Sequence, residues 1–351
     1  MSEFFQVKTL QVKDNIIEKE ISDGKHRMPF EIKVGKNSKE KKGLFILHGH
    51  GANKKYARFY DDEWIIISPL DIYGTEGLGS WWLGEKGNFF TFRLLQELVL
   101  RVREEYNIEQ VFFWGSSMGG YGAILHGTIC KADAIYAHMP QVKLIGTDYT
   151  DGVNSKFYLP IFNTEKSQYE SLLDFLVNVD KKESPVYFLS QNVFDYPKYV
   201  SQHFIPLVGV LDSKGLAYSV EMNLEEGHKI FRNVVNTVDN IFKPNFDKIK
   251  KWRTGEKSPS KNITSNINID IAYDKNTVKI TSLHDIQGCD FACYLYINEK
   301  LVSKQHYKKD PNFFFKLNER LQKGDLIVAR YYSRLIANKT VRFSKPFSKT
   351  Y

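Results

Sequence analysis

The sequence predicts an α/β protein with a mostly parallel sheet, followed by a smaller all-β domain. Three observations support this fold class. Short apolar segments alternate with amphipathic segments from about residue 43 onward. A G-x-S-x-G motif stands where one of the apolar segments meets a helical pattern. The composition changes after Trp252, and the 351 residues suffice for one large domain and one small one.

The candidate strands of the first domain are short and rich in apolar or β-branched residues, as expected for parallel strands covered on both faces. They span 44–47, 64–68, 110–114, 134–138, 186–190 and 216–223. Helical patterns begin near Asn88, a candidate N-cap, and cover about 118–130, 199–211 and 229 to beyond 242. Residues 1–42 predict a leading antiparallel strand or two, and the irregular segment 141–180 predicts an insertion over the site.

The composition after Trp252 predicts a linker and then a β-sandwich. Residues 253–262 carry almost nothing to bury. Beyond them, short strand patterns alternate with turns at 268–273, 278–281, 291–298, 301–307, 313–316, 325–332 and 340–343. We therefore expect a catalytic domain over 1–252, a linker over 253–266 and a β-sandwich over 267–351.

Composition and termini favour a protein of the cytoplasm. The three cysteines, Cys130, Cys289 and Cys293, are too few and odd in number for a disulfide framework, which fits a reducing compartment. The first residues lack the pattern of a secretory signal. No apolar run approaches the roughly 18–20 residues of a membrane-spanning helix.

The net charge of +8 and the pI near 9.0 are compatible with nucleic acid, an anionic membrane face, an anionic polymer or a phosphate-bearing substrate. The lysines are dispersed along the chain, and a solvated lysine surface is the ordinary explanation of such a charge. Because no zinc-finger, aromatic RNA-binding or basic-zipper signature accompanies the charge, we expect no nucleic-acid partner.

The G-x-S-x-G motif consists of Gly115, Ser117 and Gly119, between an apolar strand and a helical pattern. This is the context of a nucleophile elbow, in which a strained turn lifts the serine above the sheet. Small residues two positions before and after the serine avoid a clash with neighbouring backbone. Ser116 lacks glycines at these offsets. The motif therefore predicts an α/β-hydrolase fold with Ser117 as the nucleophile.

Two backbone amides are expected to form an oxyanion hole. The amide of Met118 lies at the start of the helix after the serine. The other should come from the loop after the first core strand, 48–51, where we assign His50, with Gly51 as the alternative. His48 and His50 resemble metal ligands, but no acid or cysteine cluster accompanies them, and we expect no metal.

A general base and an acid are expected on the loops after the last core strands. His228 follows the strand 216–223, stands on a loop after a glycine, and is predicted to open a helix. Asp195 follows the strand 186–190, and Asp212 is the second choice for the acid because it falls at a helix end. The order Ser117, Asp195, His228 is that of an α/β-hydrolase triad. Packing or surface exposure is expected for the histidines at 126, 138, 203, 284 and 306.

The segment 71–85 combines flexible glycines with Trp81 and Trp82. It follows a strand on the side where the catalytic loops gather. Exposed indole faces suit stacking on sugar rings or on an acyl carrier. The alternative is that one tryptophan packs under the loop.

Together, the elbow 115–122, the loop 48–51 and the segment 81–84 resemble bacterial α/β-hydrolase-type O-acetyltransferases of capsular polysaccharide, and the related glycan acetyltransferase of accessory secretion systems. The resemblance covers roughly residues 40–240. It implies acetyl transfer from acetyl-CoA, a co-substrate and not a bound cofactor, to a sugar hydroxyl through an acetyl-serine on Ser117. It also implies a cytoplasmic site near the inner membrane face, where capsule is built. The C-terminal β-domain departs from the smallest capsule enzymes.

The residues alone establish acyl transfer and leave the acceptor open. Water as acceptor gives a carbohydrate or small-molecule esterase, and a sugar hydroxyl gives a transferase. The resemblance and the basic charge favour the transferase. A catalytically inactive scaffold in polysaccharide or secretion assembly is the alternative from another class, because fold alone does not establish activity. No feature selects for peptide substrates.

Overall fold

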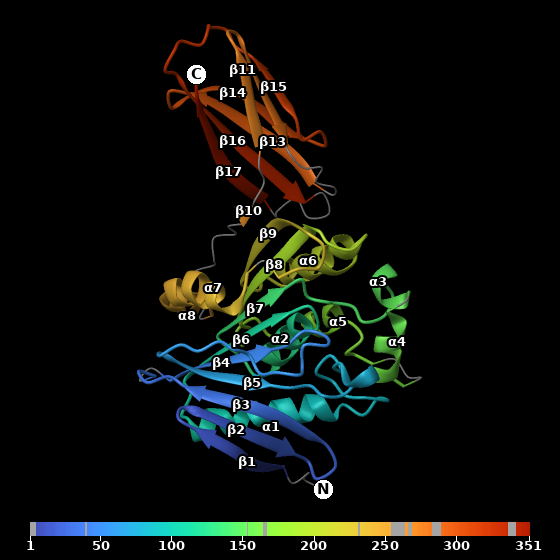
Figure 1. The fold of residues 1–351 in the computed structure, drawn as a ribbon. Coiled ribbons are helices and arrows are strands. Elements are labelled where there is room, and N and C mark those ends of the chain that lie inside the picture. Colours follow the sequence, from blue (N-terminus) through green and yellow to red (C-terminus); the bar gives the residue numbers. More distant parts are fainter. Residues whose placement is uncertain are drawn as a thin grey trace. The chain divides into compact units, whose positions relative to one another are not determined.

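The computed structural model describes residues 5–38, 41–152, 154–163, 167–230, 232–253, 264–265, 269–282, 289–335 and 342–351. They belong to two compact units (Figure 1). The first unit comprises Met1–Gln191, Tyr196–Tyr218 and His228–Pro259, and the second comprises Asn192–Asp195, Ser219–Gly227 and Ser260–Tyr351. We describe each unit by itself.

The first unit is built on a sheet in the order β1-β2-β3-β5-β4-β6-β7-β8. The strands are β1 (Gln6–Lys13), β2 (Ile16–Ser22), β3 (Arg27–Val34), β4 (Lys42–Leu47), β5 (Trp64–Pro69), β6 (Gln110–Ser116), β7 (Ala134–His138) and β8 (Val186–Phe194). Strands β1, β2, β3 and β5 pair antiparallel, whereas β5, β4, β6, β7 and β8 run parallel. The predicted mostly parallel sheet is therefore confirmed.

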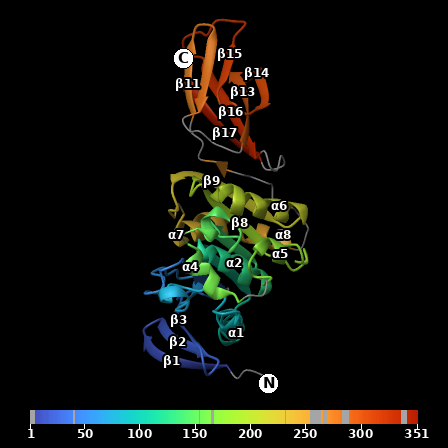
Figure 2. The same cartoon turned by 90° about the vertical axis from the view of Figure 1, so that its right-hand side faces the viewer.

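Helices cover both faces of this sheet (Figures 1 and 2). They are α1 (Phe90–Glu105), α2 (Met118–Ile129), α5 (Leu172–Leu176), α6 (Ile205–Ser213), α7 (Val234–Thr237) and α8 (Phe246–Arg253). Alternate residues of each strand point to opposite faces. Leu44 and Ile46 of β4 pack in one core cluster with Phe242 and Ile249, whereas Phe45 stacks on Phe113 with ring centroids 5.0 Å apart. Burial on both faces explains the continuous apolar strands.

The described residues of the predicted insertion, 141–180, form short helices and loops. It contains α3 (Asp148–Asp151), α4 (Ser155–Tyr158), the 3₁₀ turn η2 (Leu159–Ile161) and α5. Backbone contacts attach it to the loop that follows β5, because Lys86 and Gly87 donate to the carbonyls of Pro160 and Ile161 at 2.8 and 2.9 Å. The insertion and this loop therefore form one layer.

The N-terminal strands and the last helices differ from the sequence prediction. Residues 5–38 form three antiparallel strands, where one or two were expected. The helix predicted from residue 229 begins only at Val234, because the side chain of Asn233 caps α7 by accepting a hydrogen bond from the amide of Asn236 at 2.9 Å. Wide π-helical turns, η3 (Val200–Phe204) and η4 (Val238–Phe242), interrupt the last helices, and the 3₁₀ turn η5 (Lys243–Asn245) leads into α8.

The second unit consists mainly of two antiparallel sheets. One sheet has the order β11-β12-β15 and the other β14-β13-β16-β17. The strands are β11 (Ile269–Asp274), β12 (Thr277–Ser282), β13 (Cys289–Ile297), β14 (Lys300–Lys308), β15 (Phe313–Lys316), β16 (Leu326–Leu335) and β17 (Arg342–Thr350). Phe313 of the first sheet packs against Tyr331 of the second at 5.6 Å, so that aromatic side chains lie between the sheets as in a sandwich.

The second unit also takes in β9 (Tyr218–Glu226) from Ser219 onward, which pairs in parallel with β10 (Thr264–Ser265). The grouping of segments 192–195 and 219–227 with the C-terminal unit was not predicted from the sequence. Most of the predicted linker, namely 254–263 and 266, lies outside the described residues. No helix in the described part of the chain is long and apolar enough to cross a membrane.

Candidate active site

Ser117 occupies a strained turn between β6 and α2. Its φ and ψ are 57° and −118°, a combination that a residue with a side chain rarely adopts. The glycines of the motif permit the turn. A Cβ on Gly115 would lie 2.0 Å from the carbonyl oxygen of Gly119, and one on Gly119 would lie 2.1 Å from that of Leu47. The sequence-predicted elbow is thus present, and its spacing follows from these two close approaches.

The amide of Met118 is positioned to meet negative charge beside Ser117. Met118 is the first residue of α2, whose N-terminal amides carry the positive end of the helix dipole. Its side chain is fully buried and packs against Gly79, where a Cβ would lie 2.6 Å from the Met118 sulfur. This packing fixes the helix start, as the predicted oxyanion role requires.

The loop after β4 holds the second predicted oxyanion donor. The Gly51 amide donates to the carbonyl of Leu78 at 2.8 Å, so this amide is already engaged. The assignment of the oxyanion donor to His50 stays a prediction. The His50 ring is held between aromatic rings, stacked on Trp81 at 5.2 Å and edge-on to Phe157 at 4.6 Å. Burial lowers the pKa of this imidazole, although the charges of two nearby carboxylates oppose the shift.

His48 is a structural histidine. Its Nδ1 lies 2.9 Å from the carbonyl oxygen of Gly49, and its Nε2 accepts the amide of Asp71 at 2.9 Å. The ring is therefore neutral with the proton on Nδ1, and burial lowers its pKa to about 4. Within the described ranges, no group of three or more His, Cys, Asp or Glu side chains could hold a metal ion.

His138 contacts the backbone of Ser117 and the backbone beside the predicted base. It is fully buried at the end of β7, and its carbonyl oxygen accepts the amide of Ser117 at 2.9 Å. Its Nε2 lies 3.1 Å from the carbonyl oxygen of Lys229, the residue after His228. The sequence analysis expected only packing here. A histidine at the end of the strand next to the nucleophile strand was the available signal.

The two acid candidates lie on different elements. Asp212 accepts the hydroxyl of Tyr218 at 3.0 Å, which commits it to the end of α6. Asp195 directly follows β8 and falls in the second unit. In that unit, Gly227 donates its amide to the carbonyl of Phe194 at 2.7 Å. These two hydrogen-bonded residues immediately precede His228 and Asp195 in the chain.

Trp81 and Trp82 are buried, which corrects the expectation of exposed indole faces. Their exposed fractions are 2% and 0%. The Trp81 indole N–H donates to Gln141, and its ring lies 4.5 Å from that of Tyr158 in the insertion. Trp82 packs against Gly122 of α2, where a Cβ would lie 2.4 Å from the indole. Both residues therefore pack beneath the loop 71–85. The alternative given in the sequence analysis expected such packing for one of them.

A buried carboxylate organises this loop. Asp71 is fully buried and accepts the amides of Ser80, Trp82 and Tyr73 at 2.7, 2.9 and 3.3 Å, and the Ser80 hydroxyl at 3.0 Å. Burial raises the pKa of Asp71, while these hydrogen bonds oppose the shift. Both tryptophans have positive φ, 52° and 61°, a strained backbone that the Asp71 contacts hold in place.

Tyrosines surround the imidazole of His228. The rings of Tyr199, Tyr196 and Tyr149 lie 5.1, 5.6 and 6.2 Å from it, centroid to centroid. Tyr199 is buried and donates to the carbonyl of Met139 at 2.9 Å. Tyr196 is 48% exposed, and Tyr149 of α3 lies beside it at 4.9 Å. The sequence analysis missed this cluster, because it assembles segments some 80 residues apart.

The other histidines named in the sequence analysis are either buried and hydrogen-bonded or exposed, where they are described. His126 is fully buried in α2, with its Nε2 3.0 Å from the carbonyl oxygen of Trp82 and its Nδ1 2.7 Å from the Gln96 amide. Burial lowers its pKa to about 3. His203 is buried and accepts the amide of Val142 at 3.2 Å. His306 is exposed on β14, and His284 lies outside the described residues.

Comparisons with known proteins confirm the fold. No protein-family model matches the sequence, and no curated protein matches it. The structure is similar to S-formylglutathione hydrolase from Agrobacterium tumefaciens, with a TM-score of 0.50 and 14% identity over 71% of this chain and 98% of that one. Capsule O-acetyltransferase of Neisseria meningitidis serogroup A follows with a TM-score of 0.45 and 16% identity over 66% and 94%. The larger part of the chain thus has the predicted α/β-hydrolase fold.

Proposed function

We propose that the protein is a serine O-acetyltransferase that moves an acetyl group from acetyl-CoA to a sugar hydroxyl of a capsular or other surface polysaccharide. The observation that carries the proposal is the backbone of Ser117, strained at a strand-to-helix turn that two crowded glycines make possible. Strain of this kind persists where the surroundings enforce it, and it is typical of nucleophiles. The choice of acetyl-CoA and sugar rests on the sequence resemblance of the elbow and the two loops.

The reaction proceeds in two acyl transfers. Ser117 Oγ attacks the thioester carbonyl while His228 takes its proton, and the amides of Met118 and His50 stabilise the oxyanion. The tetrahedral species collapses as the C–S bond breaks, and the coenzyme A thiolate receives the proton from His228. A sugar hydroxyl then attacks the acetyl-serine, His228 again taking and returning a proton. Asp195 orients the imidazole and stabilises its charged form.

Two observations support the residues assigned to the base and the acid. The His138 ring contacts the backbone next to His228, and its carbonyl oxygen contacts the backbone of Ser117, so one buried residue fixes both loops. The hydrogen bond from Gly227 to Phe194 ties together the residues that precede His228 and Asp195. Asp195 is the better acid of the two because this hydrogen bond joins the residue before it to the residue before His228, whereas Asp212 lies at the end of α6 and accepts the Tyr218 hydroxyl.

The tyrosine cluster supports a sugar as the acceptor. The acceptor hydroxyl must reach the imidazole of His228 to lose its proton, and partly exposed aromatic rings stand beside that imidazole. Tyr196 and Tyr149 present ring faces of the kind on which sugars stack, with a hydroxyl for hydrogen bonding. This pair replaces the buried tryptophans as the proposed acceptor contact.

The proposal includes a cytoplasmic location, peripheral to the inner membrane face. It follows from the implied use of acetyl-CoA and from the place where capsule is assembled in the enzymes that the sequence resembles. The net charge of +8 favours association with an anionic surface.

The proposal is tested by intact-mass spectrometry after brief incubation with acetyl-CoA. We expect one added acetyl group on the wild-type protein and none on Ser117→Ala, because only the serine oxygen can carry the acyl group. Coenzyme A release is measured in the same samples, since rapid deacylation would empty the intermediate. If the wild-type protein shows no acetyl adduct and releases no coenzyme A, acetyl-CoA is excluded as the donor.

A fluorophosphonate probe separates the alternatives in that case. Labelling of Ser117 without use of acetyl-CoA would identify an esterase with another acyl donor, to be assayed next on carbohydrate esters. A folded wild-type protein that is never labelled would instead support the non-catalytic scaffold. The Ser117→Ala variant is the matched control, because it removes the labelled oxygen and leaves the backbone turn in place.

A further inference from the structure

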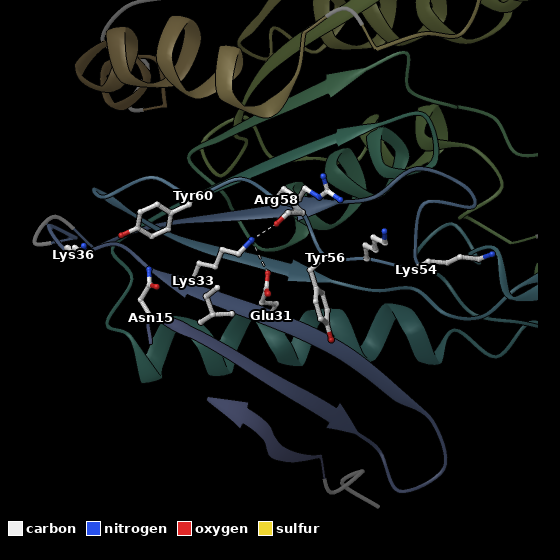
Figure 3. A pocket seen from close by; sticks show the side chains of 11 residues that line it. Asn15, Glu31, Lys33, Lys36, Lys54, Tyr56, Arg58 and Tyr60 are labelled. Carbon is white, nitrogen blue, oxygen red and sulfur yellow. Dashed lines mark hydrogen bonds and ion pairs between the residues drawn. The ribbon is translucent and has the colours of Figure 1, made fainter. Parts of the chain in front are cut away.

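A basic groove lies on the first unit, beside the segment that follows the oxyanion loop (Figure 3). Its volume is about 670 Å³. The charged residues that line it are five cations and one carboxylate: Lys33, Lys36, Lys54, Lys55, Arg58 and Glu31. Asn15, Tyr56 and Tyr60 add polar groups to the wall. The groove is separate from the residues assigned to catalysis.

One of the five cations belongs to the floor of the groove. Lys33 and Glu31 are each 8% exposed and form an ion pair at 3.0 Å. The Lys33 ammonium also donates to the carbonyl of Ala57 and, at 3.3 Å, to that of Phe59. These contacts hold the segment 57–59 against β3. Glu31, the only carboxylate among the residues that line the groove, is paired with Lys33 and therefore does not neutralise the other four cations.

The other four cations are exposed and have no anionic partner in the described part of the chain. Lys36, Lys54, Lys55 and Arg58 form no ion pair with any described residue. Like charges around one hollow repel each other, and a bound anion with several charges would relieve that repulsion. Lysines scattered over the surface for solvation alone would not gather around one groove whose buried charges, Lys33 and Glu31, already neutralise each other.

The charges are distributed along the groove. Lys36 and Tyr60 lie at one end, Arg58 in the middle and Lys54 at the other end (Figure 3). The Lys54 end is anchored to the catalytic loops. The side chain of the preceding residue, Asn53, is buried and donates to the carbonyls of Asp71 and Gly77 at 2.8 and 2.6 Å. The groove therefore extends from the loop that carries His50.

We propose that this groove binds the anionic groups of an acidic polysaccharide chain. An extended chain with repeated carboxylate, sulfate or phosphate groups matches cations that are spaced along a groove, whereas a single small anion would use only one end. Burial raises the pKa of Tyr56 to about 12, so its hydroxyl stays neutral and can donate to sugar or anionic oxygens. The choice of a glycan among polyanions rests on the proposed function.

The test compares two triple variants of the full chain that lose the same charge. Lys54→Gln with Lys55→Gln and Arg58→Gln empties the groove of three cations. Lys181→Gln with Lys182→Gln and Lys214→Gln removes three exposed lysines elsewhere. The probe is fluorescent dextran sulfate, with neutral dextran of equal length as the reference. We expect salt-sensitive binding of dextran sulfate alone, weakened at least tenfold in the groove variant and less than twofold in the control.

If both variants bind dextran sulfate equally weakly, the binding follows the net charge of the protein, and the assignment to the groove is overturned. Tighter binding of a single-stranded oligonucleotide of equal charge would overturn the glycan assignment. A groove variant that loses coenzyme A but keeps dextran sulfate would assign the groove to the co-substrate phosphates instead. Hydrolysis of 4-nitrophenyl acetate should be unchanged in both variants. A wild type that binds dextran sulfate but neither forms acetyl-Ser117 nor releases coenzyme A from acetyl-CoA would refute the proposed function and leave the groove assignment standing.

Discussion

The two sides of the candidate site are built by different physics. On the nucleophile side, the turn at Ser117 is set by backbone sterics, with glycines at the two positions where a Cβ would meet a carbonyl oxygen. On the loop side, residues 71–87 are held by buried polar groups: the Asp71 carboxylate, and the rings of His48 and His126. The first arrangement depends on backbone atoms of the motif itself and of one neighbouring strand, whereas the second depends on side-chain hydrogen bonds between residues 9 to 44 positions apart.

This difference determines how each side should respond to mutation, to pH and to chemical change. The sterically built elbow should tolerate no added carbon atom and should be indifferent to mild acid. The polar loop should depend on the charge state of its buried groups, because an unpaired or wrongly protonated group in a low-dielectric interior is costly.

The largest effect is expected at Gly119. The change Gly119→Ala places a Cβ about 2 Å from a carbonyl oxygen of β4 and must move the strand or the helix start. We expect a loss of more than about 3 kcal/mol in the free energy of unfolding, measured by urea denaturation. The control is Gly209→Ala in α6, where an added Cβ meets nothing within 4 Å. This change should stabilise by roughly 0.5–1 kcal/mol. Similar values for both would contradict a steric elbow.

A slightly smaller effect is expected at Asp71. Asp71→Asn replaces an acceptor oxygen with an amide nitrogen that faces backbone donors, so at least one buried hydrogen bond becomes a repulsion. We expect a loss of about 2–4 kcal/mol in the free energy of unfolding. Hydrolysis of 4-nitrophenyl acetate should also weaken, because the predicted oxyanion loop contacts this segment. Asp174→Asn, at an exposed position of α5, is the matched control and should change stability by less than about 0.5 kcal/mol. Equal stability of the two variants would show that the carboxylate does not organise the loop.

The same difference explains what the sequence could and could not predict. The strands were predictable because both of their faces are buried, and the elbow because its glycine spacing is dictated by contacts within eight residues and one neighbouring strand. The burial of Trp81 and Trp82 was not predictable, since it depends on contacts with Gly122, Gln141 and Tyr158. The delayed start of α7 and the tyrosines around His228 likewise require three-dimensional proximity that no local pattern encodes. The catalytic roles of Ser117, His228 and Asp195, and of the oxyanion amides, remain predictions.

Acid should weaken the loop side through His126. The folded protein holds this ring neutral, with a pKa of about 3 against about 6.5 when unfolded. Below pH 6.5 the unfolded chain therefore binds a proton that the folded chain does not. The contribution of the neutral His126 to the free energy of unfolding is fully present above pH 6.5. It falls by roughly 1.4 kcal/mol per pH unit on acidification toward pH 3.

The variant His126→Gln keeps a donor for the Trp82 carbonyl and removes the titration. Urea denaturation at intervals from pH 7 to pH 4.5 should show a shallower loss of stability for the variant than for the wild type. Parallel curves for the two proteins would mean that His126 is not kept neutral by the fold. The elbow variants at Gly115 or Gly119 should show no such change of slope, because no titrating group holds that turn.

The smallest effect is expected at His138, where the two sides meet. We infer a positioning role, because its ring contacts the carbonyl of Lys229, beside the proposed base, and its own carbonyl accepts the Ser117 amide. The backbone contact survives any substitution, so His138→Ala removes the contacts of the ring, including the one to the Lys229 carbonyl. We expect kcat for 4-nitrophenyl acetate to fall about tenfold, which corresponds to roughly 1.4 kcal/mol, with KM unchanged and a displaced pH profile of kcat. His138→Gln retains a donor at the position of Nε2 and should recover most of the rate. If both variants lose the same activity and keep the wild-type pH profile, His138 serves packing alone, and the loop of His228 must be held by other contacts.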